Sequence, residues 1–247
     1  MEIVDYLILG HGYTAQYLVQ NLPPDKKWVA TSRTNKDFHY FDLADMESWD
    51  QLPKAKFTFW TFPPAPLDLV KNFFNENKKK LGTLVVVGST SGFLTSEPHQ
   101  LVDESTPLDD SIERAEAEKY LSDQWAILVI ISVIYVPDKN PIDWVKNGYV
   151  GKRDKYVNMI HVEDLANIIF QASQKGEKGF TYIASDNLPL RWADVICLWE
   201  EKALVSEVAE KPSKRISKKI NSSMTLKTLD IELKFKNFAE VVIRESL

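Results

Sequence analysis

The residues with the clearest chemical potential lie in a glycine-rich turn near the start of the chain. The segment YLILGHGYTAQYLVQNL runs from an apolar stretch into a helical pattern through Gly10, His11, Gly12, Tyr13, Thr14 and Ala15. Gly10 permits a tight turn, Gly12 lets the backbone approach a pyrophosphate, and the small Ala15 lets the helix pack closely on the strand. Free backbone N–H groups and the positive end of the helix dipole would hold the anion. The segment predicts a dinucleotide-binding turn, with an ordinary strand-to-helix turn as the alternative.

Arg33 follows the second apolar run, in the sequence VATSRTN. An acidic residue at this point would bind the adenosine ribose of NAD, whereas the guanidinium of Arg33, beside Ser32 and Thr31, suits a 2′-phosphate. We therefore predict NADP(H) as the preferred cofactor and NAD as the alternative; a surface arginine without a ligand is the simpler interpretation. Asp42 and Leu43 follow the next run, where a carboxylate would accept a hydrogen bond from the adenine amino group or start a turn.

A parallel sheet is needed to position these residues. In the first half of the chain, short apolar runs alternate with helical patterns, which indicates strands joined by crossover helices. The predicted strands are Tyr6–Leu9, Trp28–Thr31, Phe38–Phe41, Phe57–Thr61, Leu84–Val87 and Ile127–Ile131. The predicted helices are Thr14–Asn21, Leu67–Lys80 and Ser111–Gln124. This order predicts an α/β, Rossmann-like, doubly wound parallel sheet with ligand loops at the carboxyl ends of its strands.

The regular alternation weakens after about Pro137. We predict an NAD(P)-binding domain over residues 1–137 and a small C-terminal α/β substrate-binding region over residues 138–247, packed on the same core. Its predicted elements are a helix at Asp143–Lys146, a strand at Val157–His161, a helix at Glu163–Ser173, a strand at Phe180–Ala184, and helices at Trp192–Lys202 and Asn237–Glu245. The Lys-rich stretch Glu207–Asn221 is predicted to be an exposed connection.

Composition limits the class of partner. With 247 residues, 44% hydrophobic and 26% charged, the chain has globular proportions, and its net charge of -5 argues against broad nucleic-acid binding. No apolar run reaches the roughly 20 residues of a membrane-spanning helix, and the opening MEIVDYLILG lacks the features of an export signal. A single cysteine, Cys197, excludes an internal disulfide and a thiolate zinc cluster. We predict a cytoplasmic protein with a small-molecule substrate, no nucleic-acid or membrane partner, and no metal.

Several motifs together resemble the NAD-dependent epimerase/dehydratase family, the extended or atypical branch of the short-chain dehydrogenases and reductases. They are, in chain order, GHGYTA, FDLAD, VVVGSTSGF, VDESTP, IYVP and VNMIHVEDLANII. The resemblance implies an NADP-dependent oxidoreductase, epimerase or dehydratase acting on a small polar carbonyl or alcohol, or on a nucleotide sugar. It also implies a homodimer, and a backbone segment at Phe62 and Pro63 that passes close to the cofactor.

The resemblance also points to catalytic positions, and there the chain departs from the family. Typical members use a Ser or Thr after the fifth strand, and a Tyr and a Lys four residues apart on the next helix. Ser89 matches the serine, whereas aligning ERAEAEKYL through Glu118 places Arg114 at the lysine and Asp110 at the tyrosine. Arginine cannot relay a proton, and an unperturbed aspartate is ionised at neutral pH. A dinucleotide-binding sensor or scaffold without turnover is therefore the alternative function.

Four further residues are predicted to lie on the substrate side: Thr90, Glu104, Asn158 and His161. Glu104 and His161 also have simpler structural interpretations. Glu104 could be a surface loop acid rather than part of a lid over the pocket. Asn158 and His161 are three apart on a predicted strand, so their side chains would point to opposite faces. His161, followed by two acidic residues, could simply mark a helix start.

Overall fold

A computed structural model of the chain describes residues 3–136, 138–148, 150–206 and 216–246. The chain divides into two compact units, each built from separate stretches of sequence. The first comprises Met1–Phe93, Pro107–Ile130 and Leu165–Tyr182; the second comprises Leu94–Thr106, Ile131–Asp164 and Ile183–Leu247. The predicted domain boundary at residue 137 lies outside the described residues and stays a prediction.

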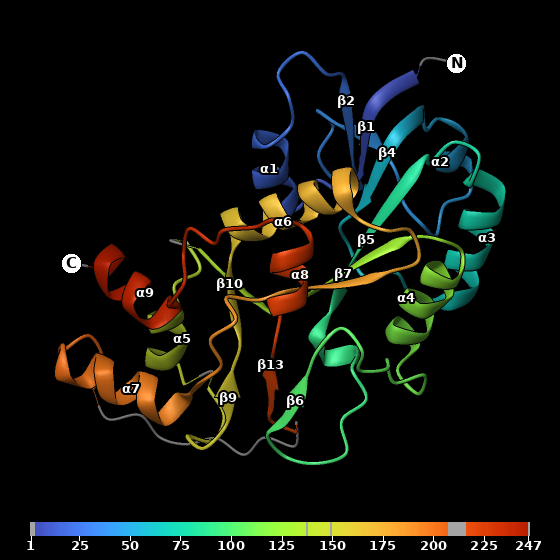
Figure 1. The fold of residues 1–247 in the computed structure, drawn as a ribbon. Coiled ribbons are helices and arrows are strands. Elements are labelled where there is room, and N and C mark those ends of the chain that lie inside the picture. Colours follow the sequence, from blue (N-terminus) through green and yellow to red (C-terminus); the bar gives the residue numbers. More distant parts are fainter. Residues whose placement is uncertain (1–2, 137, 149, 207–215, 247) are drawn as a thin grey trace. The chain divides into compact units, whose positions relative to one another are not determined.

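Seven strands form one sheet (Figure 1). From one edge to the other its strands are β3 (His39–Tyr40), β2 (Trp28–Ser32), β1 (Ile3–Leu9), β4 (Lys54–Trp60), β5 (Thr83–Ser89), β7 (Ile127–Ile131) and β11 (Thr181–Ala184). The pairs β2–β3, β1–β2, β1–β4 and β4–β5 are parallel. The chain reverses its direction of travel across the sheet between β1 and β4, which is the switch point of a doubly wound fold. The predicted fold class is confirmed.

Helices cover both faces of the sheet in the first unit (Figure 1). One face carries α1 (Tyr13–Gln20) and α6 (Val162–Lys175), and the other carries α2 (Glu47–Asp50), α3 (Leu67–Asn77) and α4 (Glu113–Asp123). Because the strands are buried on both sides, they read as almost continuous apolar runs. Phe73 of α3 illustrates the packing, since its ring lies 5.3 Å from both Trp49 and Trp60.

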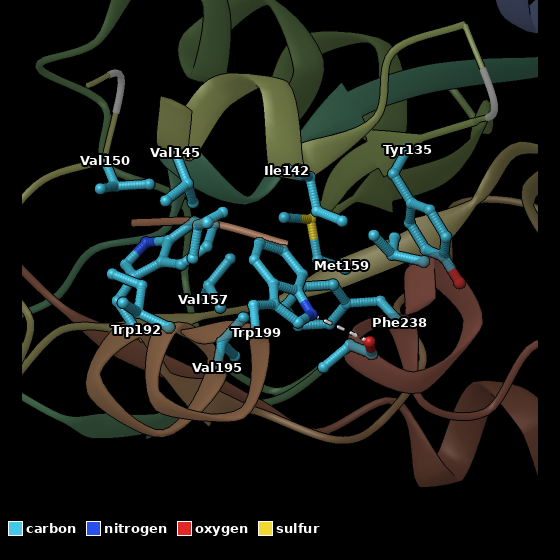
Figure 2. Packing of buried hydrophobic residues seen from close by; sticks show 14 of the residues in the cluster. Tyr135, Ile142, Val145, Val150, Val157, Met159, Trp192, Val195, Trp199 and Phe238 are labelled. Atoms are coloured by element: carbon cyan, nitrogen blue, oxygen red, sulfur yellow. Dashed lines mark hydrogen bonds between the residues drawn. The ribbon is translucent and has the colours of Figure 1, made fainter. Parts of the chain in front are cut away.

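The second unit is built from shorter elements around its own apolar core. Its strands are β6 (Gln100–Val102), β8 (Val133–Tyr135), β9 (Tyr156–Val157), β10 (Met159–His161), β12 (Leu190–Arg191) and β13 (Lys218–Ile220). Its helices are α5 (Pro141–Lys146), α7 (Trp192–Glu201), α8 (Ser223–Thr228) and α9 (Phe238–Ser246). The indole of Trp199 is buried among these elements and donates to the Ala239 carbonyl at 3.0 Å (Figure 2).

Two sequence predictions about elements are corrected. Residues 207–215 of the predicted exposed connection lie outside the described residues, but its end forms β13, which pairs in parallel with β6 and buries Ile220. The helix predicted from Ser111 begins at Glu113 instead, and this places Asp110 before the helix.

Across the described residues, no helix has the length and apolarity to span a bilayer, and no three His, Cys, Asp or Glu side chains are grouped as metal ligands.

Candidate functional site

The glycine-rich turn joins β1 to α1 and is tied to the strands on either side. Gly10 has a φ of +90°, a conformation that favours glycine, and an added Cβ would lie 2.9 Å from Cδ1 of Phe62. The N–H of Gly10 donates to Oγ1 of Thr31 on β2 at 3.0 Å, and Oγ1 of Thr61, after β4, donates to the Gly10 carbonyl at 2.6 Å. These contacts fix the direction in which the turn presents its amides.

Gly12 is the residue at which the turn opens to a ligand. Its backbone is extended, with φ of -88° and ψ of -167°, and no atom lies within 4 Å of the position an added Cβ would occupy. It stands at the N-cap of α1, and as a glycine it has no side chain with which to cap this helix end. Since the first amides of a helix lack intrahelical acceptors, the start of a helix is a favourable place for an anion.

A cavity of about 560 Å³ lies in front of this turn, within the size range of small-molecule sites. Its walls come from the carboxyl ends of β1, β2 and β4, the segment after β3, and the start of α3. Eight predicted cofactor residues line it: Gly10, His11, Gly12, Arg33, Asp42, Leu43, Phe62 and Pro63. The other three, Tyr13, Thr14 and Ala15, form the first turn of α1, where Thr14 and Ala15 are buried. The residues predicted from separate sequence segments are therefore brought together.

Arg33 and Ser32 form a polar part of the cavity wall. Arg33 is exposed and forms no ion pair with a described acidic residue. Ser32 accepts hydrogen bonds at its Oγ from the amides of Thr34 and Asn35, at 3.2 and 3.0 Å. Its hydroxyl proton is therefore directed away from them.

The imidazole ring of His11 contacts the ring of Phe38. Its ring is stacked on Phe38 with centroids 3.9 Å apart, and its backbone N–H donates to the Thr31 carbonyl at 2.7 Å. Partial burial lowers the pKa of His11, so the neutral imidazole is favoured in the ligand-free protein.

Ser89 ends β5, two strands from β1 at the same carboxyl edge of the sheet. Two strand spacings are roughly 10 Å. The Ser89 hydroxyl caps the short 3₁₀ turn Thr90–Gly92, accepting from the Ser91 amide at 3.3 Å, and lies 2.9 Å from the Ser91 hydroxyl. Both Ser89 and Thr90 are partly exposed, so the predicted loop carries hydroxyl groups that remain accessible.

Arg114 and Glu118 form an ion pair on α4, beneath the loop that carries Ser89. The Arg114 Nε donates to Oε1 of Glu118 at 2.7 Å, and its guanidinium also donates to the Val87 carbonyl at 3.4 Å. The carboxylate of Glu118 is fully buried, and its Oε2 has no hydrogen-bond partner in the described chain. Burial raises the pKa of Glu118 to about 7 despite the opposing charge of Arg114. The pair holds Arg114 in one orientation.

Asp110 does not have the surroundings of a catalytic acid. It lies before the start of α4, so it and Arg114 do not stack on successive helical turns. Its carboxylate is more than half exposed and pairs with Lys119 at 2.6 Å. The Asp110 carboxylate is therefore part of a surface ion pair, and its alignment with the family's tyrosine stays a prediction.

In the second unit, Glu104 and Asn158 make structural contacts. Oε1 of Glu104 accepts from the amide and the hydroxyl of Thr225, at 3.0 and 2.5 Å. The side-chain amide of Asn158 donates to the Lys218 carbonyl at 3.0 Å and accepts from the Ile220 amide at 2.8 Å. It thus pairs with the backbone of β13 as a neighbouring strand would. The polar groups of both side chains thus already have partners within the unit.

His161 lies at the end of β10 and is 2% exposed. Its Nδ1 accepts from the Glu163 amide at 3.3 Å, which supports the helix-start interpretation, and its ring lies 3.6 Å from Phe235. Burial lowers the pKa of His161 to about 4, so the imidazole is neutral at physiological pH. Asp164, three residues further along, accepts from the amides of Lys234 and Phe235, each at 2.9 Å.

Comparison with known proteins supports the fold. No family model matches the sequence, and no curated protein matches it. Among solved structures, RMD from Pseudomonas aeruginosa complexed with NADPH has a TM-score of 0.69 at 16% identity, over 98% of both chains. A structure assigned to the NAD-dependent epimerases/dehydratases, from Methylobacillus flagellatus, has a TM-score of 0.67 at 19% identity, over 99% of both chains. The chain has the epimerase/dehydratase fold.

A third structure of this fold is UDP-glucose 4-epimerase from Thermotoga maritima with UDP-glucose, with a TM-score of 0.75 at 13% identity, over 98% of this chain and 99% of that one. The resemblance predicted from the motifs is confirmed at the level of the epimerase/dehydratase fold. Sequence analysis did not predict the roles of Thr61 and Phe38, which position the glycine-rich turn. The available signal for Thr61 was a hydroxyl at the carboxyl end of the strand beside β1.

Proposed function

We propose that the chain binds NADP(H) at the turn between β1 and α1. The observation that carries this proposal is the open space beside Gly12, which stands at the N-cap of α1 and lines a cavity of about 560 Å³. A pyrophosphate fits this environment, because it is anionic and needs close backbone approach rather than side-chain contact. Asp42, Phe62 and Pro63 then border the adenosine half of the cofactor.

The preference for NADP(H) over NAD rests on Arg33. Its guanidinium has no acidic partner in the described chain and lies beside Ser32, whose hydroxyl can donate a further hydrogen bond. Together they offer charge-assisted hydrogen bonds to a 2′-phosphate.

We propose an oxidoreductase, epimerase or dehydratase reaction on a small polar carbonyl or alcohol, including nucleotide sugars. When bound, the nicotinamide supplies hydride transfer. The Ser89 hydroxyl would donate a hydrogen bond to the substrate oxygen, and Thr90 would contact the substrate. Arg114 would contribute a fixed positive charge that favours an electron-rich oxygen, while Glu118 keeps it oriented. We also propose a homodimer, which the family resemblance implies, and a cytoplasmic location, which the single cysteine favours.

A second candidate is a redox-state sensor that binds the dinucleotide without turnover. It is favoured by one observation: Asp110, which the predicted alignment places at the family's tyrosine, is a surface residue paired with Lys119. Fold alone does not establish catalysis.

Two experiments test these proposals, a binding titration and a single-turnover reaction. Adding NADPH to the protein should give saturable fluorescence quenching at micromolar concentrations, and the absence of saturation would exclude both candidates. Single-turnover oxidation of bound NADPH with a panel of carbonyl compounds, including keto sugars and nucleotide-linked keto sugars, separates them. Oxidation that is lost in Ser89→Ala, with NADPH affinity retained, supports the enzyme. Saturable binding with no oxidation by any compound supports the sensor.

A further inference from the structure

Trp125 has a backbone conformation that glycine or asparagine usually adopts. It follows the C-terminus of α4 with φ of +70°, and it is 71% exposed. Its amide donates to the Ser122 carbonyl at 2.8 Å, and the next amide, of Ala126, donates to the Leu121 carbonyl at 3.0 Å. Helices that end in this left-handed conformation strongly favour Gly or Asn. Neither backbone preference nor burial therefore accounts for a tryptophan here.

A pocket of about 340 Å³ lies beside this tryptophan, entirely within the first unit. Phe74, Leu81, Leu84 and Ala126 provide its apolar walls. The pocket lies where β5 and β7 begin, whereas the glycine-rich turn and its cavity lie where the strands end. It is thus a separate site at the opposite edge of the sheet.

Two lysines give the pocket a positive charge. Lys78, at the C-terminus of α3, and Lys178, in the turn before β11, both line it and are exposed. Neither forms an ion pair with an acidic residue in the described part of the chain. An exposed indole face flanked by two unneutralised ammonium groups complements a ligand that carries both a ring and a negative charge.

We propose that this pocket binds a small organic anion with a flat ring, which stacks on Trp125 while its anionic group contacts Lys78 and Lys178. The volume, near the lower end of small-molecule sites, fits a single ring system with one anionic group better than a peptide segment. The site is independent of the dinucleotide cavity and of the proposed reaction.

The test uses the aromatic sulfonate 8-anilino-1-naphthalenesulfonate as the probe, with NADPH present to occupy the other cavity. Trp125→Gly removes the ring and supplies the residue favoured at φ +70°, so its urea midpoint should equal or exceed that of the wild type. We expect probe affinity to fall about tenfold in Trp125→Gly and by a similar factor in the double variant Lys78→Gln/Lys178→Gln. Trp28→Thr, which removes an exposed tryptophan elsewhere in the same unit, is the matched control and should bind the probe normally.

Three outcomes would overturn the proposal. One is equal probe affinity in the wild type and Trp125→Gly. Another is complete displacement of the probe by NADPH, which would assign it to the cofactor cavity. The last is a dimer that dissociates in Trp125→Gly by sedimentation, which would show that a second copy covers the tryptophan. The neutral analogue N-phenyl-1-naphthylamine should bind more weakly than the sulfonate, and equal affinity would contradict the role of the lysines.

Discussion

Arg33 and Arg114 are both placed at the carboxyl edge of the central sheet, but their surroundings differ. Arg33 is exposed on the wall of the cavity and has no acidic partner in the described chain, so its charge is available to a ligand. Arg114 is paired with the buried Glu118, so its position is set by the protein. The first arginine suits selectivity between cofactors, and the second suits a fixed charge near the reacting group.

Replacing Arg33 with alanine should discriminate between the two cofactors. Loss of a hydrogen bond between charged groups corresponds to about 1.5–3 kcal/mol, or roughly a 10- to 100-fold loss of NADPH affinity. NADH, which lacks the 2′-phosphate, should lose less than about threefold. Isothermal titration of both cofactors with Arg33→Ala measures the ratio. Equal losses would show that Arg33 does not contact the 2′-phosphate.

Glu118 should make folding stability depend on pH. Its pKa is raised from an ordinary 4.5 to about 7, so the folded state holds this proton over a range in which the unfolded state releases it. The free energy of unfolding should therefore decrease as the pH rises from about 4.5 to about 7.

The matched variant is Glu118→Gln, which cannot titrate. Urea unfolding at several pH values should show the stability of the wild type, relative to this variant, falling steadily across that interval. A constant difference between the two proteins would contradict the raised pKa.

At the level of elements, the site depends on where strands end. Neighbouring parallel strands place their carboxyl ends at one edge of the sheet. The cavity is therefore lined together by the turn after β1, the end of β2 and the segment after β4. These parts were predictable from sequence, since the apolar runs and the glycine spacing are local signals.

The parts that were not predictable depend on partners distant in the sequence. Strand β13 pairs with β6, bringing Lys218 opposite Gln100, and neither three-residue strand has an apolar pattern of its own. Likewise, Asp164 in the first turn of α6 accepts from amides some 70 residues away. The surface pairing of Asp110 with Lys119 could be recognised only once the start of α4 was known.

The geometry of the turn predicts that alanine substitutions at its two glycines differ in their effect on folding stability. Gly10→Ala should destabilise the fold by about 1–3 kcal/mol, because alanine is strained at φ +90° and its Cβ would meet Phe62. Gly12→Ala should change stability by less than about 1 kcal/mol, since its backbone is extended and its surroundings are open. Thermal unfolding of both variants measures the difference. Equal unfolding temperatures would contradict the geometry of the turn.

At the level of the whole molecule, cofactor binding and folding are linked. The first unit contains every described residue that lines the cavity, so NADPH should stabilise this unit against unfolding. Binding to the folded state alone stabilises it by about 2.7 kcal/mol when the ligand is present at 100 times its dissociation constant. The size of this effect depends on whether the amides at the start of α1 accept the pyrophosphate.

The most direct measurement compares NADPH binding to the wild type and to Gly12→Ser. Serine suits the extended N-cap conformation of Gly12, and its hydroxyl would satisfy the same amides that the pyrophosphate needs. The account predicts saturable micromolar binding to the wild type, at least tenfold weaker binding to Gly12→Ser, and an unfolding temperature for the ligand-free variant that is equal or higher. Undiminished NADPH affinity in Gly12→Ser, or no saturable binding to the wild type, would contradict it.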